Sequence, residues 1–182
     1  RSDVYSLGVV LTEMLTGTDL VREQLRITAG ETLSFASSPP QARGHAIEFR
    51  INAEEPAENF RPMPGTVRRW EPPRGSHVRL DSHVYQGYTV PPYYDSLIAK
   101  IIAHGTTRDE ALDRLRAALR GLRVHGVATN RDALLTIVDD PDVRAGRTTI
   151  DLLEARADAL VAAVAPDLLH RHALAAALAL HA

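Results

Sequence analysis

The stretch from Arg43 to Glu55 carries charged side chains at a spacing that could do chemistry. Its sequence, RGHAIEFRINAEE, alternates between polar and apolar residues. An extended strand with this alternation has two unlike faces, one with Glu48, Arg50, Asn52 and Glu54 and one with Ile47, Phe49, Ile51 and Ala53. A guanidinium flanked by a carboxylate and an amide can bind bicarbonate or stabilise an enolate, so Arg50 is the candidate catalytic residue. The same alternation fits an ordinary half-solvated strand of an antiparallel sheet, and the pattern alone favours that interpretation.

Elements on both sides must position this strand. Strands are expected at 66–70 and 77–81, paired antiparallel with each other, and a buried central strand at 97–103. Helices are expected at 4–15, from Thr18 or Asp19 to 29, after a capping box of Thr107 and Glu110, and at 130–139, 149–164 and 166–181. The fold class is therefore α+β, an antiparallel β-sheet with helices packed against it.

Composition limits the classes of function. Of the 182 residues, 45% are hydrophobic and 24% charged, which is typical of one globular domain with tails. The net charge of −2 provides no broad field for nucleic acid or a membrane surface. The sequence shows no membrane span and no signal pattern. The absence of cysteine fits a cytoplasmic protein.

Other common catalytic and metal-binding patterns do not occur in the sequence. The eight histidines are scattered, and the nearest two, His170 and His172, would point to different faces of a helix. We therefore expect no metal site. The sequence has no phosphate-binding loop, nucleophile elbow or dinucleotide fingerprint.

Several long segments, in order and at consistent spacing, carry a family resemblance. They are TGTDLVREQLRITAGETLSF, RGHAIEFRINAEE, FRPMPGTVRRWEPP, VRLDSHVYQGYTVPPYYDSLIAKIIAHG, TNRDALL and TIDLLEA. Together they resemble the C-terminal domain of biotin carboxylase, the ATP-dependent component of acetyl-CoA carboxylase and related acyl-CoA carboxylases. The resemblance runs from Thr12 to Glu154.

The resemblance implies roles for individual residues. Arg50 matches the arginine beside bicarbonate and biotin that stabilises the biotin enolate. Ile150 matches a residue of the adenine pocket, although on pattern alone it is a core residue at a helix start. Arg79, Asp95 and Arg114 match positions near a homodimer interface. On pattern alone, Asp95 belongs to a structural turn and Arg114 to a solvated helix face.

The resemblance also implies cofactors and partners. The family carboxylates biotin with ATP, Mg²⁺ and bicarbonate, and it works with a biotin carboxyl carrier domain and a carboxyltransferase subunit. Family positions that hold magnesium, phosphate and bicarbonate are occupied here by Ser2, Val4, Ser6 and Gly8. We therefore expect the isolated chain to be inactive. A non-catalytic dimerisation or structural remnant is the alternative, and the sequence does not identify the acyl-CoA.

The two ends of the chain differ from the central segment. Residues 1–17, RSDVYSLGVVLTEMLTG, resemble a protein kinase helix in which Asp3 would anchor the catalytic loop, which suggests a fusion or a false join. The other kinase motifs are absent, so a kinase fragment is a weaker alternative. We expect a domain at 18–155 and, at 156–182, a helical linker toward a missing downstream domain. The sequence contains no biotinylation site of the A-M-K-M type.

Overall fold

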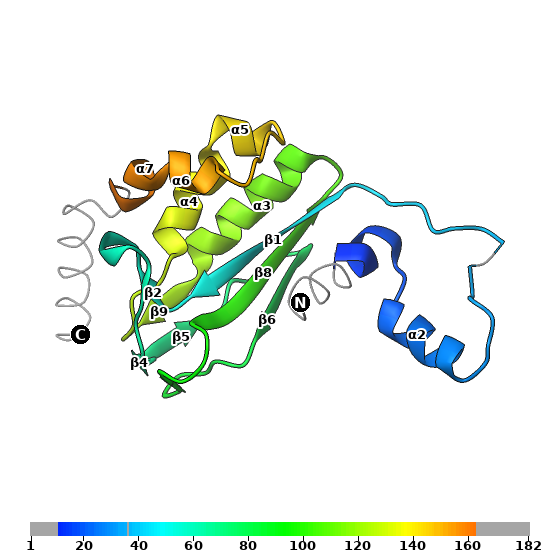
Figure 1. The fold of residues 1–182 in the computed structure, drawn as a ribbon, viewed down its shortest axis with the longest axis horizontal. Coiled ribbons are helices and arrows are strands. Elements are labelled where there is room, and N and C mark those ends of the chain that lie inside the picture. Colours follow the sequence, from blue (N-terminus) through cyan, green and yellow to red (C-terminus); the bar gives the residue numbers. More distant parts are fainter. Residues whose placement is uncertain (1–10, 36, 163–182) are drawn as a thin grey trace.

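A three-stranded antiparallel sheet is the centre of the fold, with strand order β1-β8-β6. The computed structural model describes residues 11–35 and 37–162. Strand β1 spans His45–Asn52, β8 spans Leu97–Gly105 and β6 spans Val78–Ser82. The prediction of a buried central strand at 97–103 is confirmed, because β8 lies between the other two (Figure 1). Its β-branched, apolar sequence suits that position.

Helices cover one face of this sheet (Figure 1). Helix α3, Arg108–Gly121, packs on β8 and β1, and α4, Arg131–Asp139, packs beside it. Leucines at helical spacing on α3 and just after it are fully buried together with Ile51 and Ile101 of the sheet; they are Leu112, Leu115, Leu119 and Leu122. The α+β class predicted from the sequence is confirmed.

Short two-stranded sheets surround the central one. Strand β2, Glu54–Glu55, pairs with β3, Arg61–Pro62, and the 3₁₀ helix η1, Pro56–Glu58, lies between them. Strand β4, Gly65–Thr66, pairs with β7, Thr89–Val90, and β5, Arg69–Glu71, pairs with β9, Arg123–His125.

The predicted single strand at 66–70 is therefore wrong, as is its pairing with 77–81. The backbone changes partner between adjacent residues, because Val67 N–H donates to Tyr88 O at 2.8 Å and Arg68 N–H donates to His125 O at 2.7 Å. Strand β6 pairs with β8 instead.

Helix α3 begins at its predicted cap. The Thr107 hydroxyl accepts a hydrogen bond from Glu110 N–H at 3.2 Å. The capping box is not reciprocal, because the Glu110 carboxylate accepts from the backbone N–H of Thr106 at 2.7 Å rather than from Thr107. The carboxylate also accepts from the Thr106 hydroxyl at 2.5 Å, so the preceding residue supplies both of these donors.

Of the predicted helix at 149–164, residues 163 and 164 lie outside the described part of the chain, and the rest is interrupted. The structure has α5, Pro141–Arg144, then α6, Leu152–Ala155, and α7, Ala157–Ala162. Arg156 separates the last two helices, and its guanidinium donates to the carboxylates of Asp140 and Asp142 at 2.9 Å each. These contacts connect the residue after α6 to the cap and first turn of α5.

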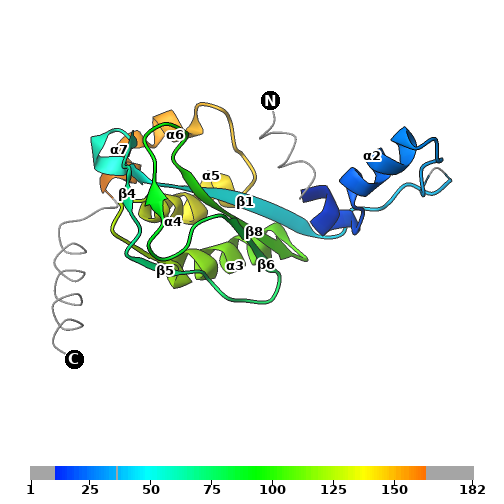
Figure 2. The same cartoon turned by 90° about the horizontal axis from the view of Figure 1, so that it is seen from below.

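The first described segment lies to the side of the sheet in both views (Figures 1 and 2). Helix α2, Leu20–Thr28, begins as predicted, with the Asp19 carboxylate accepting from Arg22 N–H at 2.9 Å. Gly30 follows the helix with a φ of +86°. Of the predicted helix at 4–15, residues 4–10 lie outside the described part of the chain, and residues 11–16 are helical. The predicted helix at 166–181 lies outside it altogether.

No helix within residues 11–35 and 37–162 is long and apolar enough to cross a membrane.

Candidate functional site

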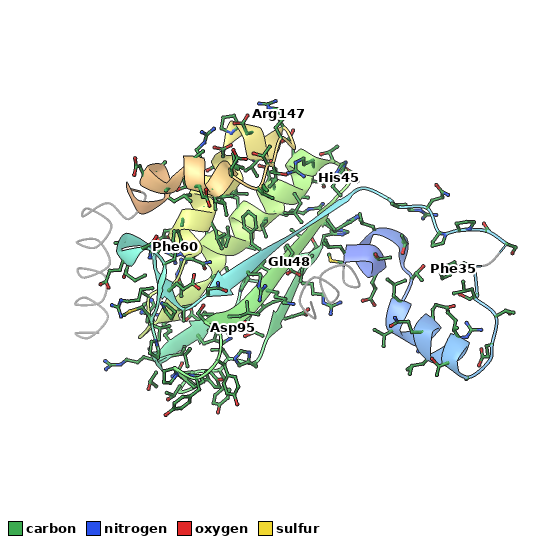
Figure 3. The ribbon with its side chains drawn as sticks, viewed as in Figure 1. Phe35, His45, Glu48, Phe60, Asp95 and Arg147 are labelled. Carbon is green, nitrogen blue, oxygen red and sulfur yellow. The ribbon has the colours of Figure 1, made fainter. Side chains whose placement is uncertain are left out.

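The sheet face opposite the helices carries the candidate catalytic residue. Directly paired residues of neighbouring strands share a face. Arg50 pairs with Lys100 and Lys100 with Asp81, which makes one polar row across β1, β8 and β6. Glu48, Ile102 and Arg79 make the adjacent row. Figure 3 shows Glu48 on this sheet and Asp95 at the end where β8 begins.

Arg50 is partly accessible, with 40% of its side chain exposed. One of its terminal nitrogens lies 3.8 Å from an Asp95 carboxylate oxygen. The other Asp95 oxygen accepts from Leu97 N–H at 3.1 Å, which fixes this carboxylate at the start of β8. At 3.8 Å the ion pair is longer than a charge-assisted hydrogen bond, and Asp95 is 66% exposed, so solvent screens the attraction. The Arg50 guanidinium therefore lies near the Asp95 carboxylate at a partly accessible surface.

Glu48 lies beside the Arg50 row in a poorly solvated position. Ile102, the residue on β8 that pairs with Glu48, is fully buried. Burial raises the pKa of Glu48, and Asp81 acts in the same direction, whereas the positive charges of Lys100, Arg50 and Arg79 oppose the shift. Among the described residues, its Oε2 atom is buried without a hydrogen-bond partner. The face therefore combines a guanidinium, an ammonium and a carboxyl group that favours its proton.

This environment makes the effect of Glu48 on stability depend on pH. Because its folded pKa is raised, the folded chain holds the proton more tightly, and the free energy of unfolding falls as pH rises from the unfolded pKa of about 4.3 through the folded value. Glu48→Gln cannot ionise. We expect its stability relative to the unmodified chain to rise across that window and then level off, as measured by urea unfolding at a series of pH values.

Glu154→Gln, on the exposed surface of α6, is the matched control for the loss of one acidic charge. A stability difference for Glu48→Gln that stays constant with pH would contradict the raised pKa.

The polar face predicted for one strand is not continuous. The pairing of β1 with β8 shifts between Ile51 and Asn52, and β1 ends there. Glu54 belongs to β2, where its carboxylate accepts from Asn52 Nδ2 at 3.0 Å and from the Ser96 hydroxyl at 2.5 Å. Ala53 N–H also donates to Ser96 O at 2.7 Å. These bonds tie the end of the Arg50 strand to the residue after Asp95.

The residues expected at a dimer interface have separate partners within the chain. Arg79 lies 2.8 Å from Asp81 and 3.2 Å from Glu13. Arg114 binds the Glu110 carboxylate and donates to His104 O at 2.5 Å. Asp95 faces Arg50 instead. The structure thus places Arg79 on β6, Arg114 on α3 and Asp95 before β8.

Ile150 is not a core residue, and the prediction from its pattern is wrong. The residue is fully exposed. Helix α6 begins two residues later, at Leu152, and Leu152 packs against the core. Leu152, and not Ile150, is therefore the apolar residue that packs against the core where this helix begins.

One residue that sequence reasoning treated as a helix start reaches the site. Asn130 precedes α4, and its side chain contacts the backbone of β1 next to Arg50. An asparagine before a helix is usually read as a cap, so its residue type gave no sign of the contact with β1.

A shallow groove borders the Arg50 row, lined by residues of β6, β8 and the segment after β6, including Asp81, His83 and Lys100. Within residues 11–35 and 37–162, no group of three histidine or acidic side chains is placed to hold a metal ion. Arg50 and Lys100 place two positively charged groups side by side next to this groove.

A match to a family model assigns this α+β fold to a domain of the biotin-dependent carboxylases. The family of biotin carboxylase C-terminal domains matches residues 48–155, and the chain belongs to it.

Among curated proteins, the biotin carboxylase of Haemophilus influenzae is 49% identical over 144 residues, which is 79% of this chain and 32% of that protein. Biotin carboxylase 1 of Bacillus subtilis is 44% identical over 144 residues, which is again 79% of this chain and 32% of that protein. The chain thus spans about a third of the length of these relatives.

A solved structure has the same fold. The biotin carboxylase domain dimer of Hydrogenobacter thermophilus 2-oxoglutarate carboxylase, in complex with MgADP, ADP and bicarbonate, superposes with a TM-score of 0.78 and 41% identity. The match covers 82% of this chain and 33% of that one.

Proposed function

We propose that this chain is the C-terminal portion of a biotin carboxylase that uses ATP and bicarbonate to carboxylate biotin. The observation that carries the proposal is the place of Arg50, which lies inside the family segment and, partly exposed, on the polar sheet face. A guanidinium there can bind bicarbonate and stabilise the negative oxygen of the biotin enolate. Lys100, paired with Arg50 across the strands, adds a second positive charge to the same face.

ATP and Mg²⁺ belong to another part of the enzyme in this proposal. Phosphoryl transfer requires a metal and a clamp around the phosphates. The described residues do not provide a cluster fitted to a metal ion, so we assign that work to segments of the relatives outside the matched third. The exposed side chain of Ile150 would then cover one side of the adenine.

We also propose the domain boundaries and partners. Residues 18–155 form the carboxylase domain, residues 1–17 are a foreign segment and residues 156–182 lead toward a downstream domain, although α7 still packs on α4 and buries Leu160. The working enzyme is a cytoplasmic homodimer that contacts its partner copy through Arg79, Asp95 and Arg114. It carboxylates biotin on a carrier domain, and a carboxyltransferase subunit uses the product.

Two assays test this function. Incubated with ATP, Mg²⁺, bicarbonate and free biotin, the isolated chain should release no phosphate that depends on biotin. A hybrid enzyme, in which residues 18–155 replace the matching stretch of the Haemophilus influenzae biotin carboxylase, should release it. Turnover by the isolated chain, or a folded hybrid without turnover, would contradict the proposal.

A non-catalytic dimerisation module is the second candidate, and the exposed part of the Arg79 side chain on β6 would belong to its contact surface. Light scattering combined with biotin titration separates the two. Arg50-dependent biotin binding, by a monomer or a dimer, supports the residual site, whereas a dimer indifferent to biotin supports the module.

A further inference from the structure

Asn130 makes contacts that its place at a helix start does not require. It is 8% exposed, which makes it one of the few buried polar residues in the described part of the chain. Within the described residues, its side chain makes no hydrogen bond to the first turn of α4. The Oδ1 atom accepts from Asn52 N–H at 2.9 Å, and Nδ2 donates to Arg50 O at 3.1 Å. Its own backbone N–H donates to Asn52 O at 3.2 Å.

These bonds imitate a neighbouring strand. In a parallel sheet, a residue accepts a hydrogen bond from the N–H of one residue on the neighbouring strand. It also donates its own N–H to the C=O of the residue two positions earlier on that strand, so its two bonds lie on either side of the residue between them. The Asn130 carboxamide does this around Ile51, on the edge of β1 that faces away from β8. One side chain thus substitutes for a short piece of sheet.

The contact falls where β1 needs support. The register with β8 shifts between Ile51 and Asn52, so the regular ladder ends just after Arg50. An irregularity of this kind changes the direction in which neighbouring side chains point. Bonds to Arg50 O and Asn52 N–H hold the backbone on both sides of the shift.

We propose that Asn130 is a positioning residue for Arg50, which it serves by fixing the backbone of β1 on either side of the register shift. The inference rests on the proposed function of Arg50 in binding bicarbonate and biotin. Only a carboxamide supplies a donor and an acceptor side by side. An aspartate at this position would be the wrong chemistry, because a carboxylate oxygen would then face the Arg50 carbonyl.

The test compares Asn130→Asp and Asn130→Ala in the full chain. Asn130→Asp keeps the acceptor for Asn52 N–H and loses the donor to Arg50 O. We expect it to weaken biotin binding, titrated in the presence of bicarbonate, by about 10-fold. In an Arg50→Ala background the same substitution should cause no further loss. Leu134→Ala, on α4 but turned to the core, is the control for general destabilisation and should bind biotin as the unmodified chain does.

Hydrogen exchange provides a measurement that needs no ligand. Asn130→Ala should speed exchange of the Asn52 amide by about 10-fold relative to Leu134→Ala, whereas Asn130→Asp should leave it protected. If the unmodified chain does not bind biotin, the residual site fails, and the exchange rates alone decide the role of Asn130. Unchanged Asn52 exchange in Asn130→Ala, or unchanged biotin affinity in Asn130→Asp when the unmodified chain binds, would overturn the inference.

Discussion

Arg50→Ala lowers the biotin-dependent turnover of the hybrid enzyme by about 100- to 1,000-fold, the range found when a fixed donor to a developing negative charge is removed. The guanidinium is held at one end by β1, whose backbone is bonded to Asn130, and faces Asp95 at the other. Alanine keeps the strand and removes the charge. The measurement is the rate of phosphate release as a function of biotin concentration.

Arg61→Ala is the matched control, because Arg61 is an exposed arginine whose ion pair is with Glu58 in the neighbouring 3₁₀ helix. It should leave the turnover of the hybrid unchanged. If Arg50→Ala reduced turnover no more than Arg61→Ala does, Arg50 would not act on the reacting groups.

Gly126→Ala destabilises the folded chain by about 3 kcal/mol, measured by urea unfolding. Gly126 has a φ of +103°, and a Cβ there would lie 2.2 Å from Thr66 O and 2.9 Å from Arg68 N. Both are backbone atoms, of Thr66 in β4 and of Arg68 just before β5, so neither can rotate away. The chain must either adopt a strained conformation or separate the end of β9 from these strands.

Gly87→Ala isolates the strain from the collision. Gly87 has a similar φ of +92°, and nothing lies within 4 Å of its Cβ position. We expect it to cost about 1 kcal/mol. Equal losses for the two variants would show that the close approach of Thr66 and Gly126 does not contribute to stability.

The parts of the fold that follow local pattern were predictable. The leucines at helical spacing located α3 and its buried face, and the β-branched sequence of 97–103 located the central strand. Each of these patterns can be read from one short segment, because a helix or strand that is buried on one face repeats its apolar residues with a fixed period. The candidate role of Arg50 also depended on alternation within its own strand, together with the family resemblance.

The errors came from contacts between distant segments. Val67 and Arg68 bond to different strands, and the partners lie at Tyr88 and His125. No short sequence segment around Val67 and Arg68 includes both of these partners. Ile150 was predicted to be buried from its apolar type, although the helix starts later and uses Leu152. Asn130 has the residue type of a cap, and only the path of the chain brings it to β1, 78 positions from Asn52.

The contact between Asn130 and β1 has a further consequence for the behaviour of the protein at high concentration. Strand β1 is an outer strand of its sheet, and the unpaired backbone groups of such strands can recruit a strand from another molecule. The Asn130 carboxamide already occupies the groups at Arg50 and Asn52. A strand of a second molecule could not pair with β1 at this point without displacing the Asn130 carboxamide. The amide that positions Arg50 therefore also blocks edge-to-edge association at this end of β1.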